Sequence, residues 1–508
     1  MSTKKNIKEI MSKRYIQIGI LIVLISLVGL MGTYAWFTWI SPSNTNVTLS
    51  IGNLADVTFT SGPDINISNL APVYNYTDGV STTFVMKNNS TTNNLNYEIK
   101  LDVTSISNEL KNESFKYTLL KDNKVVQTGN LKNAVNGKTL TLNTGLLAKG
   151  STSNYKLYFW IDGNIENSSS MMNKSLVGMI DVGEKTTYIN NLYNNSTKTP
   201  VKNNSITYQY DTTHNLMKDT AGNIRYYGAS PNNYIYFNCD SYHSTNCELW
   251  RIIGVFDGKI KLMRNSTIGE YSWDTSASSV NSGYGVNEWS QADLMKLLNP
   301  GHESELVGGS LYYNSKAGTC YNNNNYATTS CDFTSTGIKN ATTRNMIAET
   351  TYNTGGWDTS NIYYNVMYEK ERGTTVISNP SDGITRATTW TGKIALPYPS
   401  DYGYATDLSK CSQTLYNYDS STDSYACRTN DWMYPIITNS GRKHAWLLTP
   451  VSGHAYYAFY VTSTGYVSDD YYGVYTAYGV APVLYLGSDK DIVAGDGSQS
   501  NPYQLANS

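Results

Sequence analysis

The sequence predicts an exported, multidomain, β-rich protein: one N-terminal apolar helix, then an all-β sandwich, then an α+β domain. Three observations lead to this fold class. A basic N-terminus precedes one long apolar run, short stretches with alternating apolar residues follow, and all six cysteines come after residue 200. Hydrophobic residues make up 40% of the 508, too many for a disordered chain. The 38 basic residues are balanced by 40 acidic ones, which argues against a nucleic-acid partner.

The first element is a basic tip, residues 1–14, followed by an apolar segment, residues 15–40. About 20 helical residues cross a bilayer core of about 30 Å, and the charged end stays in the cytoplasm. The stretch from Gly32 to Thr38 resembles the signal segment of TasA and camelysin, secreted biofilm-fibre proteins. This resemblance implies cleavage near Ala35. We therefore expect a protein that is anchored on the outer face of a bacterial membrane through residues 15–40, or secreted after cleavage.

The second element, residues 41–190, is predicted to be an antiparallel β-sandwich. Apolar residues alternate with polar ones, which indicates half-buried strands, and turn signals such as Asn136-Gly137 separate the strands. The alternating positions are Val47, Leu49 and Ile51; Tyr97, Ile99, Leu101 and Val103; Leu140 and Leu142; Tyr155, Leu157 and Phe159.

The order of three short motifs in this stretch resembles the TasA jelly roll: residues 67–70, 85–89 and 150–162. The resemblance implies self-assembly, in which residues 41–52 donate a strand to the next subunit. A spacer that holds the following domain away from the membrane is the alternative.

A polar stretch with Pro200, residues 191–205, is predicted to be a linker. Residues 206–508 then read as an α+β domain. Asp257-Gly258 between two apolar runs predicts a hairpin with a type I′ turn. Ser290 is predicted to cap a helix with Asp293 in its first turn, and a second helix is expected near residues 342–350.

Five motifs in order make this domain resemble a family of exported domains from gut Firmicutes that is similar to the C-type-lectin fold and to variable proteins diversified by retroelements. The family usually has arginine where this chain has Ala481, so an ion pair of that arginine is missing. The motifs are Trp250–Gly254, Asn287–Ser290 with Leu294–Asn299, Tyr398–Tyr404, Trp446–Pro450 and Gly479–Leu486.

In that fold, the segment between the last two motifs forms a ligand surface. Here it is rich in tyrosine, which offers large contact area with few rotors. Tyr, Asn, Asp, Ser and His are also products of adenine-directed mutagenesis, so retroelement diversification is a hypothesis. The alternative is that half of the tyrosines point into the core. The expected ligand-binding residues are His454, Tyr456, Tyr457, Phe459, Asp469, Asp470, Tyr471, Tyr472, Tyr475 and Tyr478, and the expected inward residues are Ala458, Val461, Val467, Val480 and Val483.

The six cysteines lie in close sequential pairs, which in an exported chain predicts three local disulfides; metal binding is the alternative, but the chain has no CxxC. No cofactor is predicted. Loop oxygens of Asp489, Asp491 and Asp496 suit calcium, and a turn closed by side-chain hydrogen bonds explains them equally well. The predicted pairs are Cys239 with Cys247, Cys320 with Cys331, and Cys411 with Cys427.

No catalytic motif is present in the sequence, and the five histidines are scattered singly. We therefore predict a non-enzyme: a surface adhesin that binds a protein or a glycan. The first alternative is a structural subunit of a biofilm fibre, and the second is an extracellular enzyme of unknown type.

Overall fold

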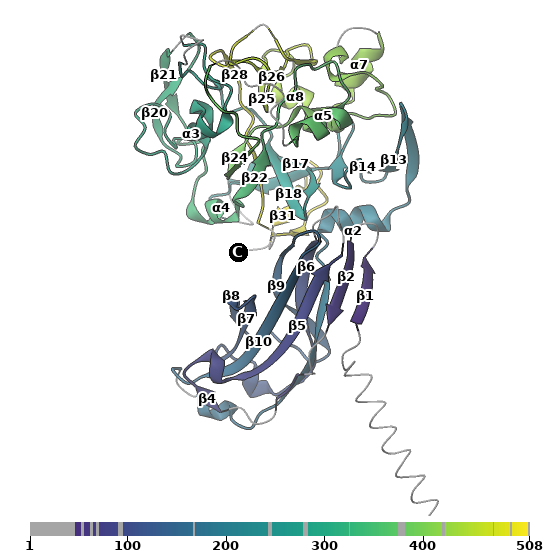
Figure 1. The fold of residues 1–508 in the computed structure, drawn as a ribbon, viewed down its shortest axis with the longest axis vertical. Helices are drawn as coiled ribbons and strands as arrows, with labels where there is room; N and C mark the ends of the chain where they lie inside the picture. Colours follow the sequence, from purple (N-terminus) through teal and green to yellow (C-terminus); the bar gives the residue numbers. More distant parts are fainter. Residues whose placement is uncertain are drawn as a thin grey trace, which may run out of the picture. The chain divides into compact units, whose positions relative to one another are not determined.

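The computed structural model describes residues 46–51, 55–60, 65–67, 71–89, 95–165, 168–241, 246–277, 283–324, 326–373, 382–418, 422–470, 472–487 and 490–505. They divide into two compact units, one ending at Lys185 and one starting at Thr186, each with its own hydrophobic core (Figure 1). The basic tip, the apolar segment and Ala35 lie outside the described residues. Within those residues, no helix is long and apolar enough to cross a membrane.

The first unit is a β-sandwich, as the alternating pattern predicted. Its described strands form a seven-stranded sheet in the order β1-β2-β5-β10-β7-β8, with β4 beside β10, and a four-stranded sheet in the order β3-β11-β6-β9 (Figure 1). The strands are β1 (Asn46–Ile51), β2 (Ala55–Thr60), β3 (Ile65–Ile67), β4 (Pro72–Val73), β5 (Val80–Asn88), β6 (Leu95–Ile106), β7 (Phe115–Lys121), β8 (Lys124–Asn130), β9 (Lys138–Leu147), β10 (Thr152–Asp162) and β11 (Leu176–Glu184).

One core joins the two sheets of this unit. Leu157 of β10 and Leu101 of β6 belong to the same buried cluster. The hydroxyl of Tyr155 donates a hydrogen bond of 2.7 Å to the hydroxyl of Tyr97, and so links the sheets inside that core. Burial of alternate side chains fixes which face of each strand points inward.

The second unit is α+β. Its described strands form a nine-stranded sheet, β12-β13-β14-β15-β17-β18-β29-β24 with β16 beside β17, and a five-stranded sheet, β19-β28-β25-β26-β27. Three two-stranded pairs complete it: β20-β21, β22-β23 and β30-β31.

The strands of the second unit are β12 (Thr199–Asn203), β13 (Ile206–Asp211), β14 (Leu216–Lys218), β15 (Ile224–Tyr226), β16 (Tyr234–Phe237), β17 (Glu248–Phe256), β18 (Lys259–Arg264), β19 (Glu270–Ser272), β20 (Ala317–Tyr321), β21 (Thr328–Asp332), β22 (Thr350–Asn353), β23 (Thr389–Gly392), β24 (Ile394–Ala395), β25 (Ala445–Pro450), β26 (Ala458–Val461), β27 (Val467–Ser468), β28 (Ala477–Gly479), β29 (Val483–Tyr485), β30 (Ile492–Ala494) and β31 (Gln504–Leu505). The helices are α2 (Tyr188–Asn195), α3 (Asp293–Leu298), α4 (Ala341–Met346), α5 (Tyr364–Glu371), α6 (Pro399–Ala405), α7 (Thr422–Thr429) and α8 (Tyr434–Ile437). Short 3-10 turns lie at Tyr76–Asp78, Asn108–Leu110, Ser168–Met171, Trp289–Gln291 and Leu415–Asn417.

The predicted hairpin is β17 followed by β18. Asp257 and Gly258 both have positive φ, 47° and 68°, as a type I′ turn requires. The predicted helix at Ser290 is shorter than expected: residues 289–291 form a 3-10 turn, Ala292 is extended, and α3 begins at Asp293. The Ser290 hydroxyl does not cap this helix, because it donates to the Glu288 carboxylate at 2.6 Å. The Asp293 carboxylate accepts hydrogen bonds from the amide and hydroxyl of Thr275, at 2.9 and 2.6 Å.

Residues 191–205 are not the linker that the polar sequence predicted. They carry the end of α2 and strand β12, both in the second unit. The hydroxyl of Thr187 caps α2, and Ile189 and Tyr193 are buried in the core of the unit. These two side chains lie one helical turn apart and pack on the core, while β12 pairs with β13.

The six cysteines form the three predicted disulfides, Cys239 with Cys247, Cys320 with Cys331, and Cys411 with Cys427. The predicted inward residues are also buried: Ala458, Val461, Val467, Val480 and Val483.

Candidate functional site

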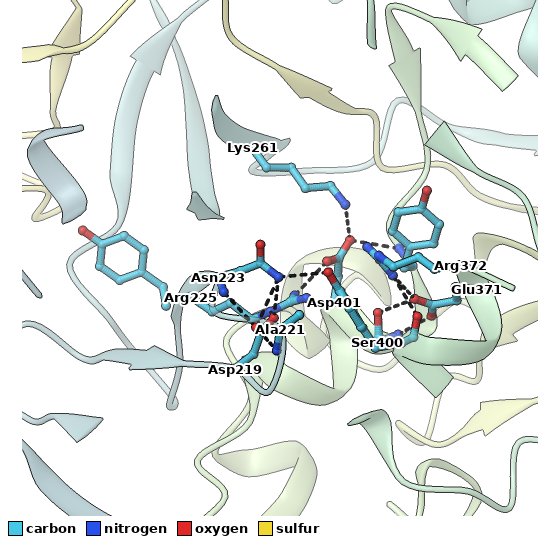
Figure 2. A network of polar contacts seen from close by, with 12 residues as sticks. Asp219, Ala221, Asn223, Arg225, Lys261, Glu371, Arg372, Ser400 and Asp401 are labelled. Carbon is cyan, nitrogen blue, oxygen red and sulfur yellow. Dashed lines mark hydrogen bonds and ion pairs between the residues drawn. The ribbon is translucent and has the colours of Figure 1, made fainter. Parts of the chain in front are cut away.

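A buried ionic network lies inside the second unit. Lys261 of β18 and Arg225 of β15 approach the Asp401 carboxylate of α6 from different directions, at 2.5 and 3.0 Å (Figure 2). Arg225 also donates to Asp219 at 2.6 Å. Burial raises the pKa of Asp401, but the two cations outweigh it and hold that pKa below its usual range. Because all of these groups are buried, we assign the network to the framework: it ties α6 to the large sheet.

The tyrosine-rich segment contributes to an aromatic surface, defined here as His454, Tyr456, Tyr457, Tyr475 and Tyr284. The rings follow one another at short centroid distances: 4.9 Å from His454 to Tyr457, 4.8 Å from Tyr457 to Tyr456, 5.6 Å from Tyr456 to Tyr284, and 5.2 Å from Tyr284 to Tyr475. Their side chains are half-buried or exposed. Rings at these distances stabilise one another through aromatic contacts, and their exposed parts present apolar area to solvent.

Tyr284 is the residue that the sequence analysis missed. It lies about 170 residues before the others in the chain and is 44% exposed. Gly285 has positive φ, and a side chain there would meet the carbonyl of Asp274 at 2.2 Å, so only glycine lets this loop reach the tyrosine-rich segment. The signal in the sequence was a tyrosine between two glycines, Gly283 and Gly285.

The predicted ligand-binding residues separate into two layers. Phe459 and Tyr478 are 0% and 5% exposed, so the prediction that they face a ligand was wrong: both belong to the core beneath the surface. Phe459 lies on β26, all of whose residues are buried. The ring of Tyr478 packs against the rings of Trp446 and Tyr460. Tyr472 is 49% exposed, and its ring lies nearly perpendicular to that of Tyr478, with the ring centres 6.1 Å apart. Tyr471 lies outside the described residues.

The two predicted aspartates differ in their surroundings. Asp469 is half-buried and accepts a hydrogen bond of 2.6 Å from the Ser360 hydroxyl. Asp470 is exposed. The pKa of its carboxyl is nevertheless raised, first by partial desolvation of the group and then by the neighbouring Asp469 charge. Asp470 is therefore the carboxylate better placed to meet a ligand.

Asn287 and Arg386 hold the loop that carries Tyr456 and Tyr457. The Asn287 amide donates to the carbonyls of Val451, His454 and Tyr457, at 3.1, 2.8 and 2.7 Å. Arg386 donates to the Asn287 side chain at 2.9 Å and to the Ala455 carbonyl at 2.8 Å. Both side chains are buried, so the loop is fixed from below.

Asp382 orients Arg386 through two hydrogen bonds of 2.8 Å. Although burial raises the pKa of Asp382, the Arg386 contacts hold that pKa below its usual range. A pocket lined by Asn287, Arg386 and His454, among others, measures about 20 Å³, enough for one water molecule. A ligand larger than water does not fit this pocket.

The loop residues considered for calcium have other partners. The Asp491 carboxylate accepts from the amide of Tyr188 at 3.0 Å, and Asp496 accepts from the amide of Ser498 at 2.9 Å, which closes a turn. Asp489 lies outside the described residues. In the part of the chain that the structure describes, no three His, Cys, Asp or Glu side chains gather as a metal site would require.

The chain matches no protein-family model and no curated protein. Solved structures that it resembles include a family 35 carbohydrate-binding module from an environmental isolate, with 14% identity and a TM-score of 0.16 over 28% of this chain and 84% of that one. Another is the C-terminal domain of EclA, a sugar-binding protein, with 14% identity and a TM-score of 0.12 over 28% of this chain and 88% of that one. A third is the PA14 sugar-binding domain of an RTX adhesin, with 12% identity and a TM-score of 0.13 over 25% of this chain and 70% of that one. TM-scores this low carry no argument for this chain.

Proposed function

We propose that the protein works outside the bacterial cell and binds a glycan or protein ligand on the aromatic surface of its second unit. The observation that carries the proposal is the row of five rings, assembled from two distant segments and fixed from below by Asn287 and Arg386. Preorganised aromatic side chains lose little entropy on binding, which is why they are frequent at binding surfaces. The similarity of residues 206–508 to the C-type-lectin fold, and their diversification by a retroelement, belong to the same proposal.

The location outside the cell is supported by the three disulfides, which persist in oxidising compartments. Anchoring through residues 15–40, or secretion after cleavage at Ala35, remains part of the proposal. Mass spectrometry of the N-terminus of the protein isolated from cells distinguishes the two.

The test is a glycan and protein array probed with the intact chain, followed by binding isotherms with the variant Tyr456→Ala/Tyr475→Ala. Loss of hot-spot aromatics should weaken binding about 30-fold or more, since single hot spots contribute about 2 kcal/mol. Tyr425→Ala is the matched control, because Tyr425 is an exposed tyrosine outside the aromatic surface. Unchanged affinity of the double variant for the array ligand would refute the proposal.

A fibre subunit is the second candidate. Strand β8 lies at the edge of its sheet, and Val125 and Val126 are exposed on it. Such an edge can accept a strand from another molecule. The predicted donor, residues 41–52, includes β1, which pairs with β2 of the same chain and would have to leave that pairing. Negative-stain images of protein lacking residues 1–35 decide: filaments favour the fibre, and single particles favour the receptor.

A further inference from the structure

A second pocket of the same unit has a buried arginine, Arg251, in its lining. Arg251 lies on β17, between Tyr234 of β16 and Met263 of β18, and is only 4% exposed. Its guanidinium carbon is 3.8 Å from the ring centre of Tyr234 and 4.9 Å from that of Trp432.

The hydrogen bonds of Arg251 go only to neutral acceptors. Its Nε donates to the Asn233 side chain at 2.5 Å, and its Nη2 donates to the Pro231 carbonyl at 3.3 Å. Within the described residues, Nη1 has no hydrogen-bond partner, and no carboxylate lies within ion-pair distance of this guanidinium.

Two other buried arginines of the unit have the carboxylate partners that Arg251 lacks among the described residues. Arg225 has Asp219 and Asp401, and Arg386 has Asp382. Burial lowers the pKa of Arg251 to about 10, so the group is still charged at neutral pH. A buried charge without a counter-charge destabilises a fold and is normally paired, by the protein or by a ligand.

The pocket above Arg251 has the size and lining for a small polar ligand. It measures about 520 Å³, within the usual range for ligand sites. Hydroxyl and amide side chains line it beside Arg251: Ser230, Asn265, Ser266, Thr267 and Asn439. Arg264 orders part of this wall, because its Nη1 donates to the Ser266 hydroxyl at 2.5 Å and its Nε binds Glu248.

We propose that this pocket binds an acidic sugar, whose carboxylate pairs with the free end of the Arg251 guanidinium and whose hydroxyls meet the polar wall. A planar carboxylate matches the geometry of a guanidinium group. Its negative charge would neutralise Arg251, for which the described residues supply no carboxylate partner. The pocket shares no lining residue with the aromatic surface, so this site is independent of the function proposed above.

The test measures thermal shifts and isotherms of the intact chain with glucuronic acid and N-acetylneuraminic acid. Glucose and the methyl ester of glucuronic acid are neutral controls, and N-acetylglycine presents a carboxylate without sugar hydroxyls. We expect at least one acidic sugar to raise the melting temperature and to bind about 10-fold or more tightly than the neutral controls. No shift with either acidic sugar, or equal binding of the neutral sugars or of N-acetylglycine, overturns the proposal.

Two variants locate the binding. Arg251→Gln removes the positive charge. Asn233→Asp keeps the arginine and replaces the side-chain amide that accepts from Arg251 Nε by a carboxylate, which supplies an internal counter-charge. Each should weaken acidic-sugar binding about 10-fold or more, whereas Tyr456→Ala/Tyr475→Ala should leave it unchanged. If the folded Asn233→Asp protein binds the acidic sugar as well as the parent does, the pocket is not the site.

Discussion

At the scale of single residues, burial separates tyrosine and phenylalanine side chains that look alike in the sequence. Phe459 is enclosed by the core, whereas Tyr472, thirteen residues later, is half exposed. Phe459→Ala should therefore lower the free energy of unfolding by about 3 to 5 kcal/mol, and Tyr472→Ala should change it by less than about 1 kcal/mol. Chemical denaturation of both variants measures the difference. Equal losses would mean that Tyr472 also supports the core.

Asp431 makes stability depend on pH. Burial raises its pKa from 3.8 to about 7, and its carboxylate accepts hydrogen bonds of 2.8 Å from the Thr406 hydroxyl and the Met433 amide. A raised pKa means that the folded protein holds the proton more tightly than the unfolded chain does. The stabilising contribution is therefore complete below about pH 4 and is lost as the pH rises to about 7.

Replacing this carboxyl should remove that dependence. In Asp431→Asn the melting temperature should fall less between pH 4 and pH 7 than in the parent, by an amount equivalent to about 1.4 kcal/mol for each unit of pKa difference. Asp358→Asn, at an exposed position, is the control. A parent and an Asp431→Asn variant with the same pH profile would show that this carboxyl is not the cause.

At the scale of elements, the loop of Tyr456 and Tyr457 depends on one amide. Asn287→Ala removes the side-chain amide that donates to three carbonyls of that loop, of which the Tyr457 carbonyl keeps the amide of Val451 as a donor. We expect this loss to cost about 1 to 3 kcal/mol of stability and to speed amide exchange over residues 451–457. Hydrogen exchange followed by mass spectrometry measures it. Asn314→Ala is the control, since the Asn314 side chain donates to the exposed Glu303, away from that loop. Equal protection in the two variants would contradict the role of Asn287.

The elements also show what could be predicted from the sequence. The alternation at Tyr155, Leu157 and Phe159 correctly predicted β10, because period two follows directly from strand geometry. Asp257-Gly258 correctly predicted its turn, and the spacing of the cysteines predicted the disulfides. These features are local in the chain.

Features that depend on distant contacts could not be predicted. Helix α2 has poor helix formers, and tertiary burial of Tyr193 overrides their propensity. The place of Tyr284 beside Tyr456 depends on contacts across about 170 residues. Likewise, the lack of a carboxylate partner for Arg251 among the described residues depends on how distant segments pack around it.

At the scale of the whole molecule, each unit has a complete core of its own. Residues 186–508 should therefore fold without the first unit, form the same three disulfides and keep the ring contacts of the aromatic surface. Near-ultraviolet circular dichroism and peptide mass mapping of this piece are the measurements. Free thiols, or pairing across the three groups, would show that the first unit is needed for folding.

The three disulfides also bear on how the protein is made. Their partners are 8, 11 and 16 residues apart, so even the widest pair spans about 55 Å of extended chain. A chain that is threaded unfolded through a translocon presents both members of one pair long before the next pair emerges, since 73 residues separate Cys247 from Cys320 and 80 separate Cys331 from Cys411. If the chain is exported in this way, oxidation in order of emergence yields the native pairing, and we expect an oxidase to form the three bridges without an isomerase that corrects mispaired ones.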